Sequence, residues 1–204
     1  MSGRETPTEM TGGRETPPEV PVFAPIAEFL SACSGRLVAR VNDPAAATGA
    51  AAFARALSAS TPLEFEPRTV EALQTLPLVD TDGLGAAFVD VAPRLRWVPT
   101  FRADDGGVDL ALAPLELTRD LGGFVAGVMY VGPGKQYPLH AHPPHEVYLT
   151  IAGDAQWRWG GHDDFRTVGP DVTLYNHPGD VHSVIAGATP LVAFYMQWTD
   201  DLVT

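Results

Sequence analysis

The chain has 204 residues, of which 45% are hydrophobic and 19% are charged, a composition typical of a globular protein with one sizeable core. Its 25 acidic and 13 basic residues give a formal net charge of −12, which disfavours binding to nucleic acids and to anionic membrane surfaces. A single cysteine, Cys33, excludes an internal disulfide, and the lack of a long apolar run or a signal-peptide core predicts a cytoplasmic protein.

The first part of the sequence divides into a tail and a helical layer. Residues 1–20 contain the repeat Gly-Arg-Glu-Thr-Pro and almost no apolar side chains, so we expect a disordered tail there. Residues 21–95 carry apolar side chains at helical spacing, and Asp43 followed by Pro44 is a good helix start. Residues 84–91 are predicted to form a further short helix. These helices are expected to pack on the outside of the domain that follows.

The pattern changes to β structure in residues 96–204. Glycine and proline separate short apolar runs at intervals near 10 residues, as in a sandwich or a small barrel. The sequence lacks the alternation of strand, helix and strand that is typical of a parallel sheet. We therefore predict a mainly β fold of about eight strands, with strands at 108–112, 115–118, 124–131, 147–151, 155–159, 172–175, 182–185 and 191–198.

The histidines indicate where the chemistry lies. All six occur between His140 and His182. On a strand, the spacing of His140 and His142 would point both imidazoles to the same face, and Glu146 follows four residues later. Two neutral nitrogens and a carboxylate form a donor set that suits a divalent first-row metal with open positions for a substrate.

The spacing of these residues resembles the cupin superfamily. Gly134, His140, His142, Glu146 and Gly153 reproduce the first cupin motif without insertion or deletion, and residues 178–182 resemble the second motif. The resemblance implies a double-stranded β-helix, or jelly-roll barrel, and adds His182 as the fourth protein ligand. The cofactor implied is one divalent transition metal ion, and the sequence does not choose among Fe, Zn, Mn, Co and Ni.

A longer stretch is similar to one group of cupins. Residues 137–148 match the pattern Y-P-x-H-x-H-x-x-x-E-x-Y of cupin-type dimethylsulfoniopropionate (DMSP) lyases. This resemblance implies a carbon–sulfur lyase that takes a small zwitterionic carboxylate and forms dimethyl sulfide and acrylate by base-catalysed β-elimination. It assigns the general base to Tyr148. Tyr137 is a second candidate catalytic residue, whose hydroxyl would position the substrate carboxylate.

The physical chemistry of Tyr148 agrees with this assignment. Glu146 and Tyr148 share strand parity, so a phenol at Tyr148 would lie over the same cavity as the metal. A neighbouring dication stabilises the phenolate and lowers its pKa. Two alternatives remain open at this point: a non-haem metal cupin dioxygenase with the same ligands, and a metal- or ligand-binding cupin without catalysis. The barrel edges and the apolar helical stripes would also allow a homodimer.

Overall fold

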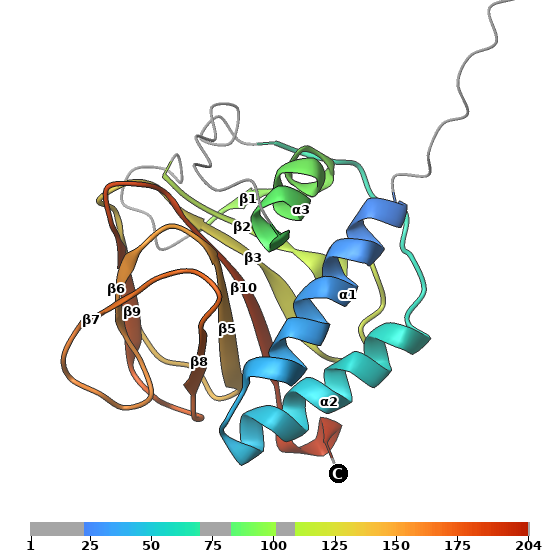
Figure 1. Cartoon of the computed structure of the whole chain (residues 1–204). Coiled ribbons are helices and arrows are strands. Elements are labelled where there is room, and N and C mark those ends of the chain that lie inside the picture. Colours follow the sequence, from blue (N-terminus) through green and yellow to red (C-terminus); the bar gives the residue numbers. More distant parts are fainter. Residues whose placement is uncertain (1–22, 70–82, 101–108, 204) are drawn as a thin grey trace, which may run out of the picture.

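A computed structural model describes residues 23–69, 83–100 and 109–203, so the predicted tail at residues 1–20 lies outside the described part. Its helices are α1 (Phe23–Arg40), α2 (Pro44–Ala59) and α3 (Gly83–Val91). They pack together on one side of a two-sheet barrel (Figure 1). Helix α2 begins where the sequence predicts, because the Asp43 carboxylate accepts hydrogen bonds from the backbone N–H groups of Ala45 and Ala46 at 2.8 and 3.1 Å.

The strands form two sheets in which all the pairs are antiparallel. The larger sheet has the order β1-β2-β3-β10-β5-β8 and the smaller one the order β4-β9-β6-β7. The prediction of a mainly β fold is therefore confirmed. The strands are β1 (Val98–Pro99), β2 (Leu110–Pro114), β3 (Val125–Val131), β4 (Gln136–His140), β5 (His145–Ala152), β6 (Ala155–Arg158), β7 (Arg166–Val168), β8 (Thr173–Asn176), β9 (His182–Ala186) and β10 (Leu191–Trp198).

Two hydrophobic clusters lie on opposite faces of the larger sheet. One fills the space between this sheet and the helices, and the other fills the barrel interior. Strand β10 shows the division clearly, because Phe194 and Met196 belong to the helical cluster whereas Tyr195 belongs to the interior. The same alternation on β5 sends Val147 and Leu149 outward and sends Tyr148 into the barrel. The inward residues of these central strands therefore face the site.

The predicted elements differ from the structure at several places. The expected strand at 115–118 is wrong: Leu115–Leu117 form a short 3-10 helix after Pro114, and the Thr118 hydroxyl donates to the Leu115 carbonyl at 2.7 Å. Strands β1, β4 and β7 were not predicted: β1 and β7 are only two or three residues long, and Pro138 interrupts the β4 sequence. His140 ends β4, but His142 lies just beyond it, so the two histidines do not share a strand. Two more 3-10 helices occupy Ala92–Arg94 and Asp200–Leu202.

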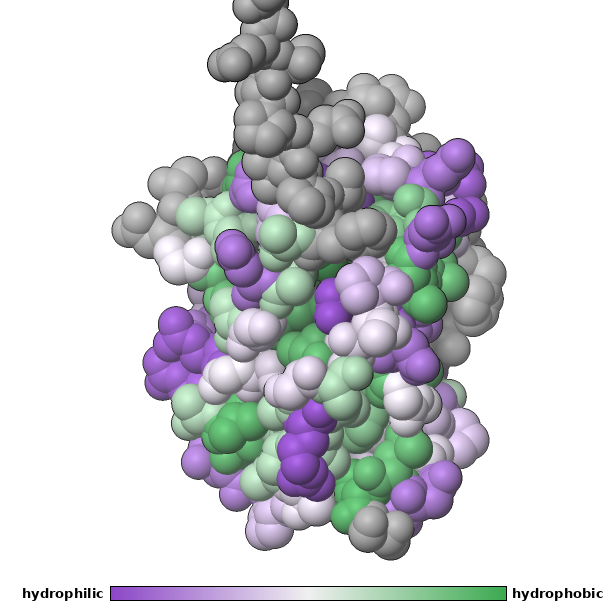
Figure 2. All heavy atoms as spheres, turned by 90° about the vertical axis from the view of Figure 1, so that its right-hand side faces the viewer, coloured by the Kyte–Doolittle hydropathy of each residue, from purple (hydrophilic) through white to green (hydrophobic). Residues whose placement is uncertain are grey.

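The helical side of the molecule has a mixed surface. Figure 2 turns the right-hand side of Figure 1 toward the viewer, and polar and apolar residues of the described chain alternate there in small groups. The described helices include none that is both long enough and apolar enough to cross a membrane.

Candidate metal centre

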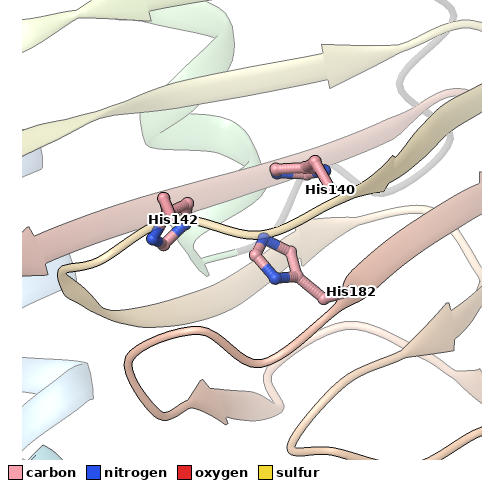
Figure 3. Close-up of side chains that lie close together, drawn as sticks. All are labelled: His140, His142 and His182. Carbon is pink, nitrogen blue, oxygen red and sulfur yellow. The ribbon is translucent and has the colours of Figure 1, made fainter.

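Three histidines lie close together in the structure, two from the first cupin motif and one from the second. His140 and His182 are cross-strand partners on β4 and β9, and their ring centroids lie 4.1 Å apart. His142 is in the loop after β4, where its carbonyl accepts a hydrogen bond from the Gly179 N–H at 2.9 Å. Figure 3 shows the three rings converging, and each offers a nitrogen within 4.8 Å of the other two. The Gly179 bond thus ties the His142 loop to the turn that leads into His182.

The backbone sets the tautomer of each histidine. Every Nδ1 contacts a backbone carbonyl two residues away, at 2.8 Å in His140, 3.1 Å in His142 and 2.9 Å in His182. A carbonyl oxygen can only accept, so each Nδ1 carries the proton that forms this bond. In the neutral imidazole the Nε2 atom then keeps its lone pair, which is the form that binds a metal.

Glu146 joins the cluster through two of the histidines. Its Oε2 atom lies 3.1 Å from Nε2 of His142 and 3.0 Å from Nε2 of His182. The contact with His182 lacks the geometry of a hydrogen bond, so this buried nitrogen has no hydrogen-bond partner among the described residues. The two Nε2 atoms and Oε2 are close enough together to share one metal ion. A metal ion bonded at about 2.1 Å would hold its ligand atoms about 3 to 3.4 Å apart, so the donor set fits a divalent ion.

The charge of Glu146 is also suited to metal binding. Its carboxylate is 1% exposed, and burial alone would raise its pKa. When the His142 and His182 rings are protonated, their hydrogen bonds and positive charge outweigh the burial and hold the pKa of Glu146 below its ordinary range; a bound metal ion would take the place of those protons. The carboxylate is therefore ionised and ready to act as a ligand.

A cavity of about 190 Å³ opens onto this cluster. Tyr137 and Tyr148 line it with Tyr195, and the Tyr137 ring stands edge-on to His140 with centroids 4.8 Å apart. Burial, followed by the negative charge of Glu146, raises the pKa of Tyr148 well above 10. Without a bound metal this phenol is neutral. The full lining is Leu112, Val125, Met129, Tyr137, His140, His142, Glu146, Tyr148, Tyr195 and Gln197.

Sequence reasoning missed Gln197, a polar residue of this cavity. Gln197 lines the cavity and donates a hydrogen bond from Nε2 to Oε1 of Glu146 at 2.8 Å. Two nearby tryptophans, Trp157 and Trp198, do not line the cavity. Trp157 packs behind Tyr148, with ring centroids 5.0 Å apart, and Trp198 belongs to the helical cluster. Strand parity would have placed Gln197 beside Tyr195 on the inward face, but no local pattern indicates that this face carries the site.

The two antiparallel sheets, with three histidines from the β4 and β9 segments facing a glutamate on β5, form a cupin fold. The family model of DMSP lyases matches residues 114–193, a range that contains the four proposed ligands and both candidate catalytic tyrosines. A curated relative, the DMSP lyase DddQ of Ruegeria pomeroyi, is 28% identical over 154 residues, which cover 71% of this chain and 75% of the relative.

Solved structures give the same result. The crystal structure of DddQ from Ruegeria pomeroyi superimposes with a TM-score of 0.69 at 25% identity, covering 87% of this chain and 93% of that one. A structure described as that of the DMSP lyases RdDddP and RnDddQII has a TM-score of 0.68 at 16% identity, with 88% and 94% covered, and supports the fold alone. The chain is thus a cupin enzyme of the lyase class and resembles the DMSP lyases in sequence and fold.

Proposed function

We propose that this chain is a metal-dependent lyase that cleaves DMSP to dimethyl sulfide and acrylate by β-elimination. The observation that carries the proposal is the cavity in which Tyr137 and Tyr148 face the histidine and glutamate cluster. The similarity to DddQ supports the choice of substrate. The cytoplasmic location and the homodimer stay predictions.

His140, His142, Glu146 and His182 would hold the metal. The orphaned Nε2 of His182 and the close Oε2 of Glu146 support this set. A divalent ion bound there would neutralise the substrate carboxylate, make the α-hydrogen more acidic and lower the pKa of the neighbouring phenol. The chain itself supplies the remaining groups, which bind the sulfonium and move the proton.

Tyr148 is the proposed base. Its phenolate oxygen takes the α-hydrogen of the substrate as a proton, and the electrons of that C–H bond form the double bond of acrylate. The C–S bond breaks at the same time, and its electron pair leaves with sulfur as neutral dimethyl sulfide. Release of the proton from Tyr148 restores the base. The ring is held for this step by Trp157 on one side and by His182, at a centroid distance of 6.2 Å.

The tyrosines of the cavity also suit the positive end of the substrate. A sulfonium cation is attracted to the faces of aromatic rings, and the cavity walls include Tyr137 and Tyr195. Tyr137 is 8% exposed and is held edge-on to His140, so its hydroxyl is well placed to orient a carboxylate at the metal. This division of roles assigns substrate positioning to Tyr137 and proton transfer to Tyr148.

The proposal is tested by Tyr148→Phe, with Tyr130→Phe as the matched control. Tyr130 is also buried, at 4% exposure, but it belongs to the cluster between the larger sheet and the helices. Both variants lose one hydroxyl and keep a ring. With metal-loaded protein and DMSP, we expect Tyr148→Phe to lower kcat by about 10² to 10⁴ while metal content is unchanged, and Tyr130→Phe to stay near the native rate.

The assay measures dimethyl sulfide in the headspace and acrylate in solution, with and without oxygen. A lyase turns over anaerobically and needs added metal after treatment with a chelator. Native turnover by Tyr148→Phe would remove Tyr148 as the base. Equal turnover by stripped and reloaded protein would reject the metal requirement, and turnover only in oxygen would favour the dioxygenase alternative.

A further inference from the structure

Three polar side chains lie at one level across the larger sheet. Glu146 on β5 pairs in register with Gln197 on β10, and on its other side with Asn176 on β8. Residues paired in this way present their side chains on the same face of the sheet. The ligand carboxylate thus has an amide side chain on each neighbouring strand.

Both amides are oriented toward the carboxylate. Gln197 donates from Nε2 to Oε1 of Glu146 at 2.8 Å, and Nδ2 of Asn176 lies 3.5 Å from Oε2. A carboxylate only accepts, so each amide must turn its NH₂ group toward it. A second contact of Asn176 supports this orientation, because its Oδ1 accepts a hydrogen bond from the Gly160 N–H at 2.9 Å.

The two oxygens of Glu146 therefore have different surroundings. Oε1 is bound by Gln197, whereas Oε2 faces His142 and His182. We propose that Gln197 is a positioning residue that fixes Glu146 as a one-oxygen metal ligand, with Oε2 toward the ion and Oε1 held away from it. This inference rests on the metal binding proposed above and not on the identity of the substrate.

Removal of the Gln197 amide would release one side of the carboxylate. Glu146 could then rotate and present both oxygens to the ion. Its carboxylate would no longer be held in the metal-binding orientation before the ion binds. Losses of hydrogen bonds behind metal ligands typically weaken metal binding about 10- to 100-fold. Gln197 is half-buried and lines the cavity, so its replacement need not disturb the two hydrophobic clusters.

The test is Gln197→Met, which keeps the length of the side chain and removes the amide. The matched control is Gln156→Met, the same change at an exposed site on β6, where the amide donates a hydrogen bond to the Thr167 hydroxyl. Co²⁺ serves as the probe on chelator-stripped protein. Its dissociation constant is measured by competition with a chromophoric chelator, and its visible absorption reports the geometry of the ligands.

We expect Gln197→Met to raise the Co²⁺ dissociation constant by about 10- to 100-fold and to change the cobalt spectrum, while Gln156→Met changes neither. The melting temperature of the metal-free protein should be close to native in both. An unchanged dissociation constant, or weaker binding with a native cobalt spectrum and a lowered melting temperature, would overturn the assignment. If Gln197→Met does not fold, Gln197→Asn, which withdraws the amide by one methylene, must show the same two changes.

The experiment also separates this inference from the proposed function. Wild-type protein that binds no Co²⁺ would overturn both the metal site and the role of Gln197. Wild-type protein that binds Co²⁺ and loses nothing in Gln197→Met overturns the role of Gln197 alone. Neither readout uses DMSP, so a failure of the lyase proposal leaves this result intact.

Discussion

Helix α2 meets the site-bearing sheet through a glycine, and this contact supports a quantitative prediction. A Cβ atom on Gly49 would lie 2.5 Å from Cε2 of Trp198, far inside van der Waals contact. Gly35 in α1 is also helical, but it is exposed and a Cβ there would meet nothing within 4 Å. The two positions therefore allow the same substitution, glycine to alanine, in one clashing and one open environment.

The magnitudes follow from this difference. In a helix interior alanine is favoured over glycine by about 1 kcal/mol, so Gly35→Ala should stabilise the protein by up to that amount. The same gain applies at Gly49, but overpacking costs about 1 to 3 kcal/mol. The stack of Trp198 on His145, with centroids 5.0 Å apart and planes 10° from parallel, resists displacement of the indole. Because the helix preference cancels between the variants, Gly35→Ala should exceed Gly49→Ala in stability by about 1 to 3 kcal/mol.

Equilibrium unfolding in urea, followed by far-UV circular dichroism, measures both free energies under the same conditions. The expected result is a rise for Gly35→Ala and a fall, or at best no gain, for Gly49→Ala. Equal stabilisation by the two alanines would refute the close packing of α2 on Trp198. Because Trp198 follows Gln197 on β10, such a result would also question the position of that strand.

Two further predictions concern groups outside the site. Burial raises the pKa of Glu116, whose Oε2 has no hydrogen-bond partner among the described residues. Ionisation of Glu116 therefore lowers the free energy of unfolding as the pH rises through the raised pKa. Glu116→Gln should increase the free energy of unfolding at pH 7 but not below the ordinary pKa of 4.5. Equal effects at both pH values in denaturant titrations would contradict this. Burial also raises the pKa of Cys33, which is 0% exposed. A thiol reagent at pH 8 should therefore modify Cys33 only in denaturant. Rapid labelling of the native protein would show that α1 is not packed as described.

The sequence predicted the parts of the site that depend on local spacing. His140, His142 and Glu146 lie within seven consecutive positions, and the structure brings His182 to them through the pairing of β4 with β9. The first two histidines meet for a reason other than the one expected. They do not share a strand, and His142 is held instead by the bond from Gly179 to its carbonyl.

The other contacts of the site depend on pairing between strands that are distant in the sequence. Gln197 and Asn176 reach Glu146 only because β10 and β8 flank β5 in this register, over separations of 51 and 30 residues. A single glutamine in an aromatic strand gives no local signal of such a contact. His145 begins β5, where Nδ1 lies 2.6 Å from the Tyr175 hydroxyl and Nε2 lies 2.9 Å from Asp200, and neither partner is near it in the sequence.

The charges of the site connect metal binding with the proposed base. Burial and the Glu146 carboxylate both raise the pKa of Tyr148, so in the metal-free protein this tyrosine is a poorer source of phenolate than a tyrosine in water. A cation at the histidines opposes the second of these causes directly, because it neutralises Glu146. The same ion would attract the substrate carboxylate. In the proposed mechanism, loss of the metal therefore removes the binding site and the active form of the base together, even though Tyr148 is not among the proposed ligands.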